Sequence, residues 1–270
     1  MNKKKLFRAS KYGFLIIISF LSLFPLLWMF IAATNKSVDV LAGTLIPGKN
    51  LIENFKVLTV NTNLYRAMWN SFKYAAVTTL ASLLISSLAG YGFEIYHDRG
   101  KDMLMKILLL SMMVPFAVIM VPLYMLFGDL GLLNTTAGFA LPTVSTAFLI
   151  FLFRQSSRNF PHEVIEASRL DGLTEIGIFF KMFIPIMRAT YAAAAVITFM
   201  NAWNNYLWPL IIMQKDSAKT MPLLISNLTA GYTTDYGVLM LAVGISILPT
   251  LILFLALQKN FAEGVTGSAK

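Results

Sequence analysis

Six apolar stretches, separated by polar segments, run along most of this chain. A membrane-spanning helix needs about 20 predominantly apolar residues, because the hydrocarbon core is about 30 Å thick and each helical residue rises about 1.5 Å. We place the predicted spans near residues 12–33, 70–93, 104–127, 136–154, 188–212 and 237–258. The pattern predicts an all-α membrane protein with six transmembrane helices, forming a single transmembrane domain over residues 1–270. Pro115 and Pro122 predict a kink in the third span.

The polar segment 155–187 is long enough to fold on its own between the fourth and fifth spans. Pro161 suits the first turn of a helix, and Asp171-Gly172 suits its end, since glycine adopts the left-handed conformation that a helix end requires. Thr174 is a suitable N-cap for a second helix ending near Phe183. We therefore predict two short helices here, with Pro185 marking the return to the membrane.

The first of these helices has a polar and an apolar face. Helical spacing places Glu163 and Glu166 on one face, and Val164, Ala167 and Leu170 on the other. A helix lying on lipid headgroups normally carries Lys and Arg on its polar face. Because this face is acidic, the pattern favours a surface that docks onto another protein.

Composition agrees with a membrane protein. The chain is 57% hydrophobic and 13% charged, with a mean hydropathy of +0.68, whereas soluble domains carry about 25% charged residues. It contains no cysteine, which excludes disulfides, thiolate metal sites and a cysteine nucleophile. The first apolar run extends over about 21 residues, longer than the 7–15 of a signal peptide, so we expect a retained first span.

The net charge of +9 follows the topology of the spans. With the N-terminus inside, the cytoplasmic segments are 1–11, 94–106, 155–187 and the tail after 258. Together with the flanking Arg154 and Arg188 they hold fifteen Lys and Arg residues, against six on the other side, and Lys73 lies within the second span. Cytoplasmic loops carry an excess of Lys and Arg, so both termini are expected in the cytoplasm of a multi-pass protein of the bacterial cytoplasmic membrane. This membrane topology accounts for the basic excess without nucleic acid as a partner.

The polar segment also has a recognisable spacing. Glu166-Ala167-Ser168, Gly172 and Met182-x-Ile184-Pro185 resemble the E-A-A-x₃-G-x₉-I-x-L-P pattern of the EAA loop in permease subunits of binding-protein-dependent ABC importers. Ser168, Met182 and Ile184 depart from it conservatively. Further segments are similar to the maltose/multiple-sugar class, and most closely to its smaller, maltose-type second permease subunit. They are Asn70-Ser71, Val121-Pro122-Leu123, Gly131-Leu132, Asn134-Thr135, Trp203-Asn204, Trp208-Pro209 and the tail 261–267.

The resemblance implies a transport subunit that is not an enzyme. It implies that the EAA-type coupling-helix loop docks onto a partner ABC ATPase dimer, which binds ATP and Mg²⁺ and hydrolyses the nucleotide. A second permease subunit, forming a heterodimer, and an extracellular solute-binding protein are the other implied partners, in addition to membrane lipid. The implied ATPase-docking residues are Glu166, Ala167, Ser168, Asp171, Gly172 and Pro185.

We expect no cofactor, metal or catalytic residue in this chain itself. The segment Gly43–Asn50 nearly matches a phosphate-binding P-loop, but Asn50 replaces the hydroxyl residue that would hold Mg²⁺. His97 and His162 lack metal-ligand spacing.

The fifth span is the candidate for a solute path. Asn201, Trp203, Asn204 and Trp208 combine amide and aromatic groups near its outer end. Buried amides need a partner or water, and aromatic rings stack on sugar C–H faces. The alternative is an interfacial aromatic belt, where Trp and Tyr commonly lie, and the sequence leaves both interpretations open.

The sequence therefore predicts a permease subunit that moves a sugar, such as an oligosaccharide, by alternating access. One alternative is an ABC permease for another solute, such as a polyol, an oligosaccharide acid or glycerol phosphate. Another is a self-contained secondary transporter, which should carry ionisable residues deep within its spans. Glu94 and Asp129 lie only at span edges, which favours the ABC importer.

Overall fold

The computed structural model describes residues 3–231 and 233–266. Every regular element in these two ranges is helical, which confirms the all-α prediction. Gly267, the last residue of the tail motif, lies outside them. Within the described residues, three helices are long and apolar enough to cross a membrane: Ser10–Ala32, Leu64–Ile95 and Tyr236–Gln258. The number rises to six if each of three sharply bent helix pairs counts as one span.

The chain divides into two compact units. The first comprises Met1–Leu64 and Leu224–Leu248, and the second comprises Tyr65–Leu223 and Pro249–Lys270. The first unit contains α1 (Lys3–Ala32), α2 (Ser37–Leu41) and α3 (Leu51–Asn61). Helices α14 (Met221–Thr229) and α15 (Tyr236–Thr266) each contribute residues to both units.

Asn54 organises the first unit around the end of α1. Its buried side-chain amide donates hydrogen bonds to the carbonyl oxygens of Ala33, at 2.9 Å, and Asn35, at 3.0 Å. The P-loop-like segment belongs to the same cluster, because the Gly48 N–H donates to Thr34 Oγ1 at 2.8 Å. A Cβ atom at Gly48 would lie 2.2 Å from Asn35 Oδ1. This loop is packed against its own chain.

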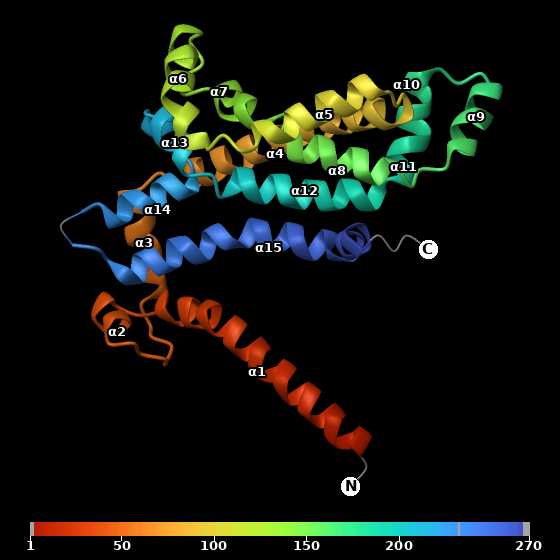
Figure 1. The fold of residues 1–270 in the computed structure, drawn as a ribbon. Coiled ribbons are helices and arrows are strands. Elements are labelled where there is room, and N and C mark those ends of the chain that lie inside the picture. The colour runs from red at the N-terminus through yellow and green to blue at the C-terminus, as the bar shows by residue number, and fades with distance from the viewer. Residues whose placement is uncertain (1–2, 232, 267–270) are drawn as a thin grey trace. The chain divides into compact units, whose positions relative to one another are not determined.

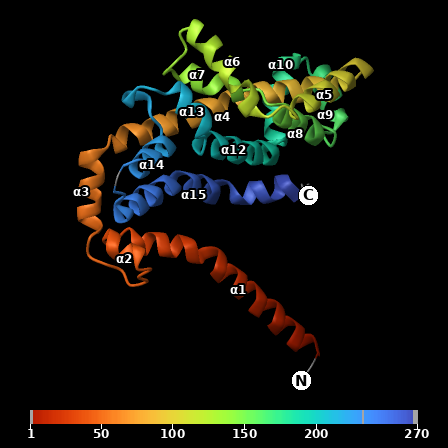
Figure 2. The same cartoon turned by 60° about the vertical axis from the view of Figure 1, so that its left-hand side comes forward.

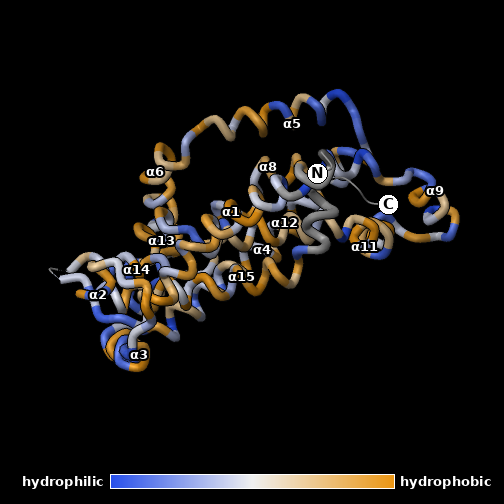
Figure 3. Tube along the Cα trace, turned by 90° about the horizontal axis from the view of Figure 1, so that it is seen from below, coloured by the Kyte–Doolittle hydropathy of each residue, from blue (hydrophilic) through white to orange (hydrophobic). Residues whose placement is uncertain are grey.

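The second unit is built on a bundle of α4, α5, α8 and α12. Helices α4, α8 and α12 lie side by side (Figures 1 and 2), whereas α5 contacts α8 near its start and then runs apart from the other three (Figure 3). The short helices α9, α10 and α11 lie at one end of this bundle, and α6, α7 and α13 at the other. The bounds in chain order are α4 (Leu64–Ile95), α5 (Arg99–Ser111), α6 (Phe116–Asp129), α7 (Thr136–Ala140), η1 (Leu141–Thr143), α8 (Ala147–Ser157), α9 (His162–Leu170), α10 (Glu175–Ile178), η2 (Phe179–Phe183), α11 (Ile184–Ile186), α12 (Arg188–Trp203), α13 (Leu207–Ile212) and η3 (Asp216–Ala218).

The third predicted span is bent far more sharply than a proline kink. Helices α5 and α6 meet at 95° across residues 112–115. Pro115 stands at the N-cap of α6 with an extended backbone, and a proline also disfavours the helical conformation in the residue before it. Pro122 lies inside α6, which continues to Asp129. Pro115 is therefore the proline that interrupts this span.

The fourth predicted span contains a bend that the sequence interpretation missed. The segment Thr136–Thr143 meets Ala147–Ser157 at 54°. Pro142 lies in the 3₁₀ turn η1 just before the break, and Thr146 starts α8 by accepting a hydrogen bond from the Leu149 N–H at 3.4 Å. Pro142 and the capping Thr146 were the signals available in the sequence.

The fifth predicted span, 188–212, ends earlier as a helix. Helix α12 ends at Trp203, and α13 starts at Leu207 after a three-residue break. Within a continuous helix Pro209 could not donate to the carbonyl of residue 205, and its ring would crowd that carbonyl. The break places Pro209 in the first turn of α13, where its missing N–H needs no partner.

Small residues allow α4 to approach α8 closely. Ser82 and Ser86 are completely buried, and a Cβ atom at Gly90 would lie 2.6 Å from Phe153 Cβ and 2.8 Å from the Arg154 backbone nitrogen. This four-residue spacing is typical of close helix packing in membranes. The Ser82-Ser86-Gly90 face is a packing face of α4.

Candidate functional site

The loop between α8 and α12 is anchored to the end of α4 by an apolar cluster. Tyr91 of α4 lies edge-on to Phe183 and Phe179, with ring centroids 4.9 and 5.5 Å away. We call this the anchor cluster, and its buried members are Tyr91, Phe160, Ile165, Ile178, Phe179, Phe183 and Met187. Tyr91 comes from α4 and the other six side chains come from the loop, so the loop packs against the end of α4 through Tyr91.

The turn between the two loop helices has the predicted geometry. Gly172 has φ +79°, a conformation that an L-residue adopts only with strain. The Leu173 N–H donates to the Ser168 carbonyl oxygen at 3.0 Å, closing the end of α9. Thr174 Oγ1 then accepts from the Gly177 N–H at 3.2 Å, so the predicted N-cap is confirmed.

The second loop helix extends beyond its predicted end. It begins at Glu175, widens into a π-helical turn over Phe179–Phe183 and continues to Ile186. Pro185 therefore lies inside the helix instead of ending it. The π turn changes the hydrogen-bond register just before Pro185, whose nitrogen cannot donate. The chain turns at Met187, and the segments before and after it meet at 81°.

An ion pair joins the two loop helices across the turn. Arg169 Nε donates to Glu175 Oε1 at 2.7 Å, and both side chains are 45% exposed. The Tyr91 hydroxyl donates to Glu175 Oε2 at 3.5 Å. The hydrogen bond from Arg169, followed by one from Tyr96, lowers the pKa of the Glu175 carboxyl below its ordinary value. Glu175 thus links both loop helices to α4.

The solvent-facing side of the loop combines charge with exposed apolar side chains. Leu170 is 90% exposed and Ile176 is 72% exposed, on either side of the Gly172 turn. The predicted docking residues Glu166, Ala167, Asp171, Gly172 and Pro185 are also exposed. Figure 3 shows the hydrophilic colour in the chain entering α5 and around α9. This side is suited to contact with a protein surface.

The register of α9 differs from the predicted apolar face. Ile165 and Ser168 are buried against the bundle, whereas Ala167 and Leu170 are exposed. The Ser168 hydroxyl donates to the Val164 carbonyl oxygen at 2.6 Å, which satisfies it in its buried position. Ser168 therefore supports the helix from the inner side. Leu170 and Ile176 were missed as surface residues because an apolar residue beside a turn is ordinarily expected to pack inward.

A buried arginine ties three bundle helices together at the same end. The Arg154 side chain is 5% exposed and its Nε donates to Glu94 Oε2 of α4 at 3.2 Å. Its Nη2 also donates to Asp102 Oδ1 of α5. Arg158 makes a longer contact with Glu94, at 3.8 Å, and is 54% exposed. We call Arg154, Glu94 and Asp102 the arginine clamp.

The predicted pathway residues are distributed over different surroundings. Asn201 is exposed and lines a cavity within the bundle. Trp203 is 1% exposed and stacks on Phe199 at 5.8 Å. Residues two positions apart in a helix differ by about 200° around its axis. Asn201 and Trp203 therefore occupy different faces of α12. The exposed Asn204 donates its side-chain amide to the Met200 carbonyl at 3.0 Å.

Trp208 belongs to a packed cluster at the opposite end of the bundle. Its ring is 1% exposed and its Nε1–H donates to the Gly138 carbonyl oxygen at 2.9 Å. The ring meets Phe116 and Phe127 edge-on, with centroids 5.9 and 5.5 Å away. Gly138 has no space for a side chain, since a Cβ atom would lie 2.2 Å from the Leu132 carbonyl oxygen. Trp208 therefore holds α13 against α6 and α7.

The motifs near the start of the second span anchor the connection after α13. Asn70 Nδ2 donates to the carbonyl oxygens of Ser217 and Lys219 at 2.9 and 3.0 Å. Ser71 Oγ accepts from the Met221 N–H at 2.8 Å. On the same connection, the Lys215 N–H donates to Asn134 Oδ1 at 2.8 Å. These polar side chains hold the connection between α13 and α14 through its backbone.

No group of three or more His, Asp or Glu residues in the described ranges is placed to hold a metal ion. The two histidines also lie on separate segments, His97 beside Asp102 and His162 at the start of α9.

Comparison with family models and curated proteins gives a consistent picture. Residues 82–267 match the model described as "binding-protein-dependent transport system inner membrane component". The chain is 45% identical over 260 residues to a protein named as the lactose transport system permease protein LacG of Rhizobium radiobacter, covering 96% of this chain and 95% of that protein.

Two further relatives have different names. The arabinooligosaccharides transport system permease protein AraQ of Halalkalibacterium halodurans is 34% identical over 254 residues, covering 92% of this chain and 91% of that protein. The sn-glycerol-3-phosphate transport system permease protein UgpE of Escherichia coli O1:K1 is 33% identical over 258 residues, covering 92% of each. Both likenesses extend over nearly the whole chain.

Among solved structures, the fold is similar to a chain of the inward-facing MetNI methionine ABC transporter. The match has a TM-score of 0.56 at 18% sequence identity and covers 73% of this chain and 93% of that chain. At this level of identity the likeness concerns the fold.

Proposed function

Because the chain belongs to the family of binding-protein-dependent transport system inner membrane components, we propose that it forms, with a second permease subunit, the pathway of an ABC importer for a sugar. The family is one of multi-pass transport subunits of the cytoplasmic membrane, which are not enzymes, and it works with an ATPase and a solute-binding protein. The predicted resemblance to ABC sugar permeases is confirmed by the named relatives.

The proposed substrate class is a sugar, such as an oligosaccharide. The relative at 45% identity is named for lactose and one at 34% for arabino-oligosaccharides. A relative at 33% is named for sn-glycerol 3-phosphate, which keeps a phosphorylated polyol as the second candidate. The higher identity to the lactose permease supports the sugar.

The coupling surface is the loop over residues 155–187. The observation that supports it is the pair of exposed apolar side chains, Leu170 and Ile176, on a loop held rigidly by the anchor cluster. Such side chains gain free energy when a partner covers them, at about 25 cal/mol per Å². We assign the docking contact to the face that also bears Glu166, Ala167, Asp171 and Gly172, while Ser168 and Pro185 shape the loop.

The loop's contacts provide a route for movement into the bundle. A displacement of the docked loop would be transmitted to α4 through the anchor cluster and the Glu175–Tyr91 hydrogen bond. It would reach α12 through the turn at Met187. ATP and Mg²⁺ would be bound by the ATPase dimer, whose closure drives the alternation between inward- and outward-facing states.

Within the pathway, Asn201 is the predicted residue whose surroundings best suit contact with solute, since it lines a cavity. Asn204 is exposed but already bonded to Met200. Trp203 and Trp208 are buried packing residues, so we assign them a supporting role. Orientation with both termini in the cytoplasm follows from the distribution of Lys and Arg.

A mild-detergent pull-down of the tagged protein from its native membrane tests this function. We expect an ATPase and a second permease to co-purify in a 2:1:1 ratio with this chain, and the solute-binding protein to stimulate ATP hydrolysis by that complex. Recovery of the chain alone, still active in transport after reconstitution, would instead identify a secondary transporter.

A further inference from the structure

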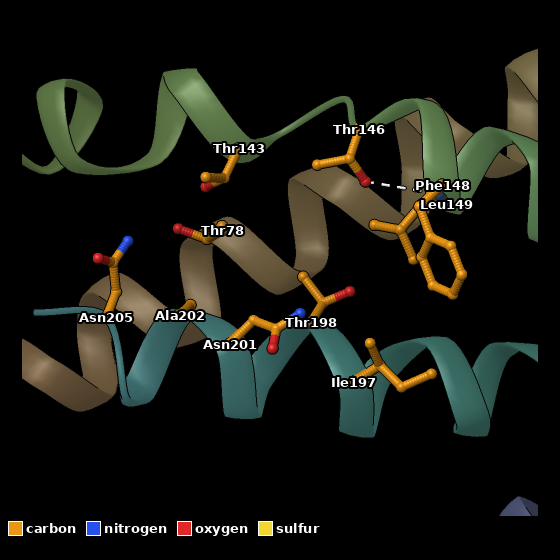
Figure 4. Close-up of a pocket in the computed structure, with 10 residues that line it drawn as sticks. All are labelled: Thr78, Thr143, Thr146, Phe148, Leu149, Ile197, Thr198, Asn201, Ala202 and Asn205. Atoms are coloured by element: carbon orange, nitrogen blue, oxygen red, sulfur yellow. Dashed lines mark hydrogen bonds between the residues drawn. The ribbon is translucent and has the colours of Figure 1, made fainter. Parts of the chain in front are cut away.

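A cavity of about 170 Å³ lies between α4, the η1–α8 segment and α12. Figure 4 shows side chains from all three elements around it. The volume is several times the roughly 30 Å³ that one water molecule occupies in the liquid. Its ten lining residues are Thr78, Thr143, Thr146, Phe148, Leu149, Ile197, Thr198, Asn201, Ala202 and Asn205. We call it the Thr/Asn pocket.

Two of the lining hydroxyls are buried without a partner. Thr78 is 1% exposed and Thr198 is 6% exposed, and within the described part of the chain neither Oγ1 atom makes a hydrogen bond. Threonine in a helix commonly satisfies its hydroxyl on the carbonyl one turn earlier, and these two do not. A buried polar group without a partner is costly, and beside a cavity a ligand or a water molecule can supply that partner.

The remaining polar groups are neutral hydroxyls and amides. Thr143 extends toward Thr78 from one side in Figure 4, and the amide of Asn205 extends from the other. Asn201 contributes a second amide from α12. Hydroxyl and amide groups each donate and accept hydrogen bonds, which matches the alternating donors and acceptors of a polyhydroxylated molecule.

None of the ten described lining residues is charged. Phosphate and carboxylate ligands are normally met by Arg or Lys, through charge-assisted hydrogen bonds, and this pocket offers neither. Its apolar part, formed by Phe148, Leu149 and Ile197, suits the C–H faces of a sugar ring. The lining therefore discriminates between the two substrate classes named for the relatives.

We propose that the Thr/Asn pocket is a subsite of this chain that hydrogen-bonds the hydroxyl groups of a neutral sugar during its passage, with Thr78, Thr198, Asn201 and Asn205 as the contacting residues. This inference rests on the proposed function of the chain in sugar import. According to this proposal, residues of both α4 and α12 contact the sugar, and the transported substrate is a neutral sugar and not a phosphorylated polyol.

Thr78 and Thr79 provide a matched pair of variants. Thr79 is the next residue on α4, is 7% exposed and also has an unpartnered hydroxyl, but it does not line the pocket. Thr78→Val and Thr79→Val remove the same group from the same helix. Because each removes an unsatisfied buried hydroxyl, neither change should prevent folding.

Uptake is measured in proteoliposomes containing the complete importer and its binding protein, with lactose, an arabino-oligosaccharide and sn-glycerol 3-phosphate as probes. With the neutral sugar that the unaltered complex transports, we expect Thr78→Val and Thr198→Val to raise the apparent KM about three- to tenfold, the loss of one hydrogen bond. Thr79→Val should leave KM unchanged. Monodeoxy analogues add a second readout, because a Thr78→Val complex should no longer discriminate against the analogue that lacks the contacted hydroxyl.

The outcomes distinguish a failure of the proposed subsite from a failure of the proposed function in sugar import. If a neutral sugar is transported and Thr78→Val and Thr79→Val give the same KM, the pocket is not a subsite, while the sugar importer stands. If the complex transports sn-glycerol 3-phosphate and neither sugar, both the neutral-sugar subsite and the proposed sugar function are overturned.

Discussion

Gly172 determines how the chain turns between the two helices of the coupling loop. Its φ of +79° lies in the left-handed region, and a Cβ atom there would meet nothing within 4 Å. The constraint is thus conformational, and the sequence could reveal it, because Asp-Gly at a helix end is a local signal. The buried hydrogen bond from Trp208 to Gly138 spans 70 residues. No local pattern encodes such a contact, so Trp208 resembled a pathway residue.

Gly172→Val should uncouple transport while the protein still inserts in the membrane. A β-branched residue at this φ costs about 2 kcal/mol, which would shift the turn and with it Leu170 and Ile176. We expect uptake to fall at least tenfold, with normal amounts of the chain in the membrane. Gly92→Ala is the control, because Gly92 also has open space at its Cβ position but lacks a positive φ. For each variant, uptake is assayed and the amount of the chain in the membrane is measured by immunoblot. Normal uptake by the Gly172 variant would refute the coupling role.

At the scale of elements, the sequence located the spans better than their breaks. The first, second and sixth spans match single helices, because each is a long apolar run that must satisfy its backbone within the helix. This holds even though Pro25 lies inside the first span and Pro249 inside the sixth. The breaks depend on which proline the packing accommodates. Pro115 precedes a 95° bend, whereas Pro122 lies within an intact helix. Propensity alone treats these two residues alike, and only tertiary contacts distinguish them.

The arginine clamp should be a major stabilising contact among α4, α5 and α8. Arg154→Met removes one partner of a largely buried ion pair and leaves Glu94, which is 16% exposed, without its charge partner. Removing one partner of a buried pair is strongly destabilising, and we expect a loss of about 3 kcal/mol in the free energy of unfolding. A larger loss is not expected, because Asp102 is 39% exposed and water screens part of its charge. Thermal unfolding of the purified complex in detergent should show a clearly lower Tm.

Arg158→Met is the matched control for the clamp. Arg158 contacts the same carboxylate from 3.8 Å and is 54% exposed, and exposed pairs contribute about 0–1 kcal/mol. Its Tm should therefore stay close to that of the unaltered complex. Equal losses of Tm in the two variants would show that burial of Arg154 contributes nothing beyond a surface charge.

For the whole molecule, the second unit has two chemically distinct ends. The coupling loop, the start of α5 and the arginine clamp lie at one end, and the Trp208 cluster and the Asn70-anchored connection lie at the other (Figure 1). The sequence anticipated this segregation, because the excess of Lys and Arg assigned the segments 94–106 and 155–187 to the same side. The Thr/Asn pocket was not anticipated, since its residues come from three elements far apart in the sequence.

The absence of cysteine allows this two-ended arrangement to be tested directly, because each single-cysteine variant carries only one thiol. Glu163→Cys lies on the exposed side of α9, and Asp216→Cys replaces a side chain that is 80% exposed on the opposite connection. A membrane-impermeant maleimide should label the Asp216 variant in cells with an intact cytoplasmic membrane. It should label the Glu163 variant only after that membrane is permeabilised, since the basic segments favour the cytoplasm. The reverse pattern would place the loop outside, away from any ATPase, and would overturn its assignment as a coupling surface.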